Sequence, residues 1–165
     1  MTTTDFFGVL EVLLRHEVDF VLIGGLAARL HGSPSVTVDV DVCPAREPEN
    51  LARLADALRE LDARLRTPED DVGFVIDAEM LGRASNLTLT TSHGYLDVLA
   101  EPIGTRGYVE LIGNARVLDV EGMKLPVVSL SDLIRMKEAS GRPKDRIELE
   151  VLGALKEELE SGGSE

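Results

Sequence analysis

Three features that would assign a chain to a whole class of protein are missing from this sequence. Cys43 is the single cysteine, so no internal disulfide can form, and the residue is expected to be a small buried hydrophobe. No apolar stretch approaches the roughly 18 residues that span a bilayer. Residues 1–5 hold no basic segment of the kind that begins a secretion signal. The sequence therefore predicts a cytoplasmic protein with no membrane partner.

Positive charge is also scarce. The chain has 17 basic and 30 acidic residues among 165, which gives a net charge of −13. A broad nucleic-acid-binding surface needs an electropositive footprint, so the charge disfavours one, although a local basic pocket is compatible with it. The charge suits a protein that binds cations or basic partners. Length and composition predict a single domain over residues 1–160 and a disordered tail at 161–165.

The most informative stretch is residues 36–42, in which valine alternates with polar residues. Successive side chains of a strand point to opposite faces, so the valines share one face and Thr37, Asp39 and Asp41 share the other. Two same-face carboxylates have Cα atoms roughly 6.6 Å apart, and they can converge on one divalent ion or on two ions. Without a cation the two anions repel each other. The alternative is a half-solvated strand whose aspartates face water.

Periodicity and turn residues predict the order of the remaining elements. Helices are expected at 6–16, 26–31, 48–66, 77–84, 108–112 and 132–139, with Ser131 capping the last of these and Pro143 beginning a further helix. Strands are expected at 20–23 and 36–42, and hairpins at 87–90 with 95–99 and at 115–120 with 123–128. Residues 68–73 form a predicted polar loop. This order predicts an α/β (α+β) fold, in which a mixed β-sheet is flanked by helices and followed by C-terminal helices.

Gly24 and Gly25 lie between the buried strand at 20–23 and the helix expected at 26–31. Glycine allows close approach to the backbone, and the free N–H groups at a helix N-terminus favour phosphate. A tight turn explains the same dipeptide without any ligand. Gly-Gly alone is therefore a weak signal.

Asp97 is an acidic residue inside the strand expected at 95–99. If that strand lies beside residues 36–42, Asp97 supplies a third oxygen ligand to the cations bound by Asp39 and Asp41. A solvated strand residue or a helix N-cap is the alternative role. The pairing of the two strands decides between these interpretations.

A basic cluster follows near the C-terminus. Within twelve positions the chain holds five basic residues: Arg135, Lys137, Arg142, Lys144 and Arg146. A solvated helix face explains some of these charges, but they gather around Gly141 and Pro143, where two helices are expected to meet. Lys137 borders the buried stripe of its helix and can reach a cleft as a point charge for phosphate.

Two blocks of sequence carry a family resemblance. The first block is Ile23-Gly24-Gly25-Leu26-Ala27, His31-Gly32-Ser33-Pro34, Thr37 and Asp39-Val40-Asp41. The second is Asp132-Leu133-Ile134-Arg135-Met136-Lys137 followed by Gly141-Arg142-Pro143-Lys144-Asp145. Together they resemble the DNA polymerase β-like nucleotidyltransferase superfamily, and they are most similar to its small prokaryotic AbiEii-toxin-like and toxin–antitoxin-associated members. The resemblance covers residues 20–42 and 95–150.

The resemblance implies transfer of a nucleoside monophosphate from a nucleoside triphosphate to an RNA or protein acceptor. In this hypothesis Asp39, Asp41 and Asp97 hold two Mg²⁺ ions, and Asp97 also acts as the base for the acceptor hydroxyl. Gly24 and Gly25 bind the triphosphate together with Lys137, whose charge neutralises the phosphates. A cognate antitoxin is an implied partner.

The chain departs from this group at Ser35, where an arginine often follows the proline. A slower enzyme, a different substrate and an inactive protein are all compatible with this departure. One alternative is therefore a catalytically inactive binding module that retains the fold and docks a basic partner. A second is a nucleotidyltransferase acting on a cationic, aminoglycoside-like small molecule. A third is a plain metal-binding domain, which has no use for Lys137.

Overall fold

The computed structural model describes residues 4–66, 75–143 and 145–162. The predicted polar loop at 68–73, Lys144 and residues 163–165 lie outside the described residues. The last helix continues through Gly162, two residues into the predicted tail. In the part of the chain that the structure describes, no helix is both long and apolar enough to cross a bilayer.

A mixed seven-stranded sheet organises the fold, with strand order β3-β4-β5-β2-β1-β7-β6. The pairs β2–β5 and β1–β7 are parallel, and the other neighbours are antiparallel. The strands are β1 (Phe20–Ile23), β2 (Asp39–Pro44), β3 (Arg64–Leu65), β4 (Asn86–Thr91), β5 (Gly94–Leu99), β6 (Arg116–Val120) and β7 (Met123–Val127). The predicted α/β class and both predicted hairpins are confirmed.

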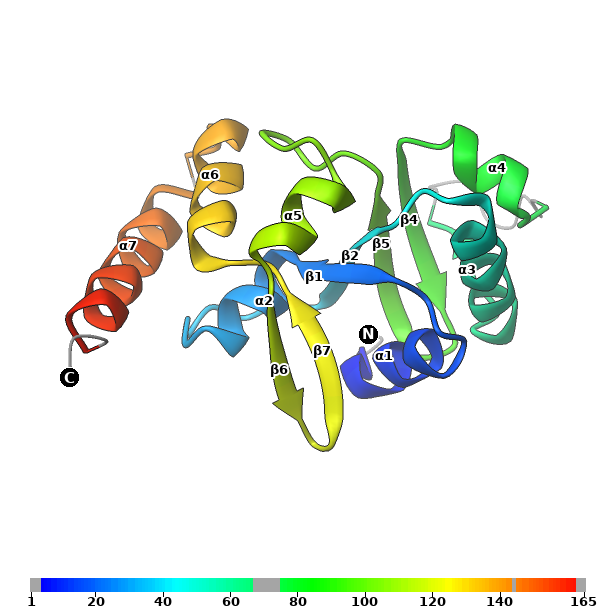
Figure 1. The fold of residues 1–165 in the computed structure, drawn as a ribbon, viewed down its shortest axis with the longest axis horizontal. Coiled ribbons are helices and arrows are strands. Elements are labelled where there is room, and N and C mark those ends of the chain that lie inside the picture. The colour runs from blue at the N-terminus through cyan, green and yellow to red at the C-terminus, as the bar shows by residue number, and fades with distance from the viewer. Residues whose placement is uncertain (1–3, 67–74, 144, 163–165) are drawn as a thin grey trace.

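Helices flank the sheet at both ends (Figure 1). α3 packs with α4 beside the β3–β4 edge, and α6 packs with α7 at the opposite end. The helices are α1 (Phe6–Arg15), α2 (Gly24–Leu30), α3 (Pro48–Glu60), α4 (Ala78–Arg83), α5 (Tyr108–Asn114), α6 (Leu130–Ser140) and α7 (Asp145–Gly162). The two C-terminal helices were expected from the sequence.

The helix predicted at 48–66 is too long. α3 stops at Glu60, because Asp62 adopts a positive φ of 50° and turns the chain. Leu65 then pairs with Leu89 across β3 and β4. Since Leu65 continues the apolar spacing of the helix by coincidence, periodicity alone does not detect this break.

Two predicted helix starts are also wrong. The hydroxyl of Ser129, not that of Ser131, accepts the N–H of Asp132 and caps α6. Ser129 precedes Leu130, which is buried as the first residue of the helix, and the cap therefore lies two positions earlier than predicted. Pro143 precedes α7, which begins at Asp145.

Only two of the four valines in residues 36–42 belong to the buried face of the strand. β2 begins at Asp39, because its pairing with β1 and β5 begins only at Asp41 and Asp39 respectively. Val40 and Val42 are buried in the core, whereas Val36 and Val38 precede the strand and are exposed. Cys43 is buried, as predicted.

A matched pair of substitutions measures this difference. Val40→Ala removes a side chain that is 0% exposed and should lower the free energy of unfolding by about 2 kcal/mol. Val38→Ala removes one that is 57% exposed and should change it by less than about 0.5 kcal/mol. Urea denaturation of both variants checks the prediction, and equal losses would contradict the observed start of β2.

Candidate active site

Three carboxylates meet on one face of the central strands. β2 carries Asp39 and Asp41, and the parallel register with β5 sets Asp41 directly beside Asp97. Oxygen atoms from all three lie within 4.8 Å of one another. We call Asp39, Asp41 and Asp97 the acidic triad. The structure therefore brings together the three acids that the sequence singled out.

Mutual repulsion and burial disturb the ionisation of these acids. Burial, followed by the charge of Asp97, a hydrogen bond with it and the charge of Asp39, raises the pKa of Asp41 from 3.8 to about 7, while Lys137 opposes the rise. Burial and the charge of Asp39 also raise the pKa of Asp97, against the effect of Arg66. The triad thus stores unfavourable electrostatic energy that a bound cation would relieve.

The backbone of Gly24 lies against the triad. Gly24 begins α2 with a φ of +75°, and a Cβ atom placed there would come within 2.0 Å of Asp41 Oδ2. A Cβ on Gly25 would come within 2.8 Å of the Thr37 side chain. The two glycines are therefore required for α2 to start this close to the acids. The helix predicted at 26–31 begins at Gly24 in the structure, two residues earlier, so both glycines belong to α2.

A cavity of about 550 Å³ opens beside these residues. Gly24, Gly25, Asp41 and Lys137 all line it, which places four of the six predicted site residues around one space. The remaining lining residues are mostly apolar or acidic and include Ile23, Leu99, Glu101, Ile103, Leu133 and Met136. An elongated ligand in this cavity would contact both the acids and a cation.

Asp145 holds Lys137 in place. The Lys137 ammonium lies 3.3 Å from Asp145 Oδ1, and Arg142 Nε donates to Asp145 Oδ2 at 3.0 Å. Burial alone would raise the pKa of Asp145, but hydrogen bonds from Ser140 and Arg142 and the charge of Lys137 hold it at about 2. Asp145 belongs to the second sequence block, yet no local pattern distinguishes it as a site residue.

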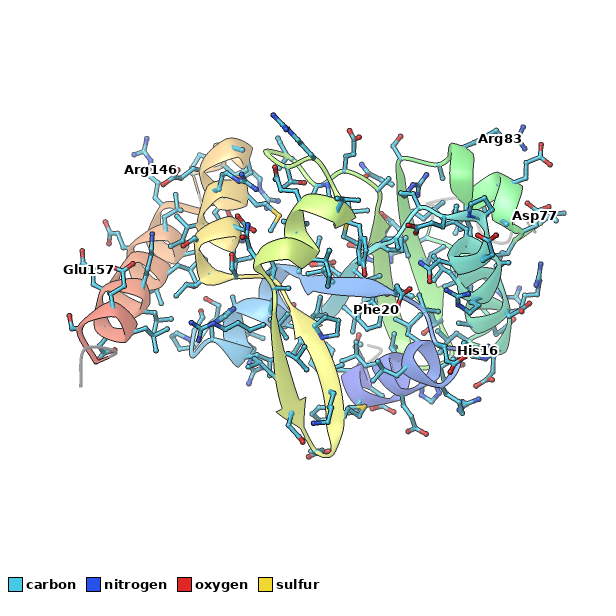
Figure 2. All side chains as sticks on the ribbon, viewed as in Figure 1. His16, Phe20, Asp77, Arg83, Arg146 and Glu157 are labelled. Atoms are coloured by element: carbon cyan, nitrogen blue, oxygen red, sulfur yellow. The ribbon has the colours of Figure 1, made fainter. Side chains whose placement is uncertain are left out.

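The predicted basic cluster separates into three parts. Lys137 and Arg142 converge on the same carboxylate. Arg135 instead pairs with Glu110 and Asp132. Arg146 is exposed on α7 (Figure 2). Only part of the cluster therefore faces the cavity, while its fifth member, Lys144, lies outside the described residues.

Arg66 is a site residue that sequence reasoning missed. Its guanidinium lies 3.5 Å from Asp97 Oδ1 and 3.7 Å from Asp39 Oδ1. The helix predicted at 48–66 would end at Arg66, whereas in the structure Arg66 directly follows β3. The short alternation at residues 63–66 was the available signal, but it is too brief to distinguish a strand from a helix end.

Ser35 joins the loop before β2 to the last helix. Its hydroxyl donates to Glu148 Oε2, and the Ser33 hydroxyl donates to Oε1 of the same carboxylate at 3.2 Å. Where an arginine was expected from the resemblance, the chain therefore has a hydroxyl that anchors the loop preceding Asp39. This contact couples α7 to the triad-bearing strand.

The acidic triad fits a divalent cation. All its donors are carboxylate oxygens, which Mg²⁺ prefers. Asp39 Oδ1 is buried and has no hydrogen-bond partner among the described residues. A buried polar atom without such a partner is costly unless something else satisfies it. Asp39, Asp41 and Asp97 are thus the residues that would hold the metal.

Neither a protein-family model nor a curated protein matches the sequence. The lincosamide antibiotic adenylyltransferase LnuA, in its lincomycin-bound form, aligns with a TM-score of 0.64 and 14% identity over 94% of this chain and 99% of its own. The chain has a nucleotidyltransferase fold.

Two further solved structures share this nucleotidyltransferase fold. A nucleotidyltransferase candidate from Thermotoga maritima aligns with a TM-score of 0.56 and 16% identity over 98% of each chain. The antibiotic-resistance factor ANT(2'')-Ia aligns with a TM-score of 0.53 and 15% identity over 96% of this chain and 91% of its own. These alignments extend over nearly the whole chain, so the fold is shared throughout.

The raised pKa of Asp41 predicts a pH-dependent effect of Asp41→Asn. Because the folded-state pKa exceeds the unfolded value of 3.8, the contribution of Asp41 to stability is present below about pH 4 and is lost as the pH rises through about 7. In EDTA at pH 8, Asp41→Asn should melt higher than the wild type by on the order of 5 °C. The difference should shrink towards pH 4, as measured by thermal denaturation. Asp56→Asn, on the exposed side of α3, is the control, and a pH-independent difference for Asp41→Asn would contradict the prediction.

Asp145→Asn tests the anchor of Lys137. Removing one partner of a buried ion pair should lower the free energy of unfolding by about 3 kcal/mol at pH 7. Since the folded-state pKa is depressed to about 2, this contribution is present above about pH 4 and disappears as the pH falls through 2. Ser140→Ala removes one donor only and should cost about 1 kcal/mol. Equal costs for the two variants in urea denaturation would count against the anchor.

Proposed function

We propose that the protein is a cytoplasmic, Mg²⁺-dependent nucleotidyltransferase that moves a nucleoside monophosphate from a nucleoside triphosphate to an acceptor hydroxyl. The observation that carries this proposal is the acidic triad, in which three carboxylates gather within 4.8 Å beside a cavity that also holds Lys137. The shared nucleotidyltransferase fold supports it. A structural or purely metal-binding domain has no need of a cation across the cavity from the acids.

Each predicted site residue has a role in this reaction. Asp39, Asp41 and Asp97 would hold two Mg²⁺ ions, which when bound stabilise the charge on the reacting phosphate and lower the pKa of the acceptor hydroxyl. Gly24 and Gly25 let the start of α2 lie close to the triad, because a Cβ atom on either would meet Asp41 or Thr37, and the free N–H groups there would bind the phosphates. Lys137, held by Asp145, neutralises charge on the triphosphate.

The chemical step is an exchange of bonds at the α-phosphorus. The acceptor oxygen forms a bond to that phosphorus, the bond to the oxygen bridging to the β-phosphate breaks, and pyrophosphate leaves with its electron pair. The acceptor proton passes to the Asp97 carboxylate, which acts as the base. Lys137 offsets the negative charge that accumulates on the departing pyrophosphate.

The resemblance to the toxin-associated group makes an RNA end or a protein side chain the first acceptor class to test. In that case a cognate antitoxin is an expected partner, and an acidic protein suits an antitoxin with a basic surface. Ser35 does not occupy the cavity in this proposal, because its hydroxyl is bound to Glu148. The loop before β2 is therefore anchored to α7 without an arginine at position 35.

A cationic small molecule is the second candidate acceptor. The net charge of −13 and the acidic residues Asp41 and Glu101 in the cavity lining favour a positively charged acceptor over a long RNA. Apolar residues such as Ile103 and Met136 offer contact for a hydrocarbon scaffold. Two of the similar structures are a lincosamide adenylyltransferase and an antibiotic-resistance factor.

Label transfer tests the proposal. The protein is incubated with Mg²⁺ and each of the four α-³²P-labelled nucleoside triphosphates, in separate reactions with total RNA, total protein, an aminoglycoside and a lincosamide. We expect label to enter one acceptor class, with a loss of at least about 100-fold in Asp41→Asn. Asp56→Asn, which removes an exposed carboxylate from α3, should keep full activity.

If no label is transferred to any acceptor, nucleotide binding distinguishes the remaining alternatives. Calorimetric titration of Mg²⁺–nucleotide should show binding to the wild type that is lost in Asp39→Asn. Binding without transfer to any acceptor would support the inactive binding module, and the absence of binding in both proteins would contradict a nucleotide site altogether.

A further inference from the structure

We infer that Arg66 makes the acidic triad selective for an anionic metal–triphosphate complex over a bare divalent cation. This inference rests on the proposed function, which assigns the triad to Mg²⁺, and it names the form in which the metal is accepted. Arg66 forms ion pairs with two members of the triad, Asp39 and Asp97.

Arg66 approaches the triad without forming close hydrogen bonds to it. Its separations of 3.5 Å from Asp97 and 3.7 Å from Asp39 exceed the roughly 2.7–2.9 Å of a strong charge-assisted bond. Asp39 Oδ1 accordingly remains without a hydrogen-bond partner among the described residues. The guanidinium therefore acts on the triad mainly through its charge, with one long bond of 3.5 Å to Asp97 Oδ1, and it leaves Asp39 Oδ1 available to a metal.

Contacts outside the triad fix the position of this charge. The guanidinium donates to the backbone carbonyl of Leu89 at 2.8 Å, and its carbon lies 3.9 Å from the centre of the Tyr95 ring. The backbone N–H of Arg66 donates to the carbonyl of Thr88 at 2.9 Å. Because strands β4 and β5 supply these contacts, the charge stays beside the triad when a ligand binds.

A fixed positive charge has opposite effects on two ligands. A bare divalent cation bound by Asp39 and Asp97 would be repelled by Arg66 at short range, in surroundings that screen charge less than water does. A metal–triphosphate complex carries net negative charge, so the same guanidinium attracts it. Asp145 offsets part of the charge of Lys137, so Lys137 contributes less to this discrimination.

Calorimetric titration of Mg²⁺ alone and of Mg²⁺–tripolyphosphate tests the inference, since tripolyphosphate is the part common to all nucleoside triphosphates. Arg66→Gln should bind Mg²⁺ alone about tenfold more tightly and Mg²⁺–tripolyphosphate about tenfold more weakly than the wild type. Arg66→Lys retains the charge and should keep the wild-type order of affinities. Opposite shifts for the two ligands are a result that loss of packing would not produce.

Arg83→Gln is the matched control, because it removes the same charge from an exposed ion pair with Glu79 on α4, at the edge of the molecule (Figure 2). Both of its affinities should equal those of the wild type. Arg66→Gln shifts in the same direction for both ligands, unchanged affinities, or Arg66→Lys behaving like Arg66→Gln would each overturn the inference. Failure of the wild type itself to bind Mg²⁺–tripolyphosphate would overturn the proposed function as well.

Discussion

The parallel pairing of β2 with β5 is the constraint on which the rest of the structure depends. It sets Asp41 beside Asp97, and the pleat adds Asp39 on the same face, so three like charges are held together. These charges repel one another, so they do not hold the site together. What holds them is the apolar side of the same strands, where Val40 and Leu96 are fully buried. Burial of these apolar side chains thus offsets the electrostatic repulsion among the three carboxylates. Such an arrangement is expected where charged groups are placed for function.

Much of this arrangement could be predicted from local sequence. Alternation identified the carboxylates of β2, the turn at Gly94 identified the hairpin that carries Asp97, and helical spacing placed Lys137 at the border of a buried stripe. These signals work because each depends on side-chain periods of two or 3.6 residues, which a single segment displays. The shared nucleotidyltransferase fold agrees with the predicted class.

The errors arose where the structure depends on residues distant in sequence. Arg66 was placed on a helix because Leu65 matches helical spacing, and only pairing with Leu89 makes the segment a strand. Val38 alternates as a strand residue does, yet the pairing of β2 with β1 and β5 begins after it. The Lys137–Asp145 ion pair requires the corner between α6 and α7, which no periodic pattern describes. Local patterns therefore predicted the acids better than the cations that accompany them.

The separation in sequence between the acids and Lys137 has a consequence for biosynthesis. The carboxylates of β2 leave the ribosome early, whereas Lys137 and its partner Asp145 come roughly a hundred residues later. Until α6 and the start of α7 have emerged, a nascent chain holds the acids without the lysine across the cavity. A chain cut before α6 would therefore retain all three acids of the triad but lack both Lys137 and Asp145.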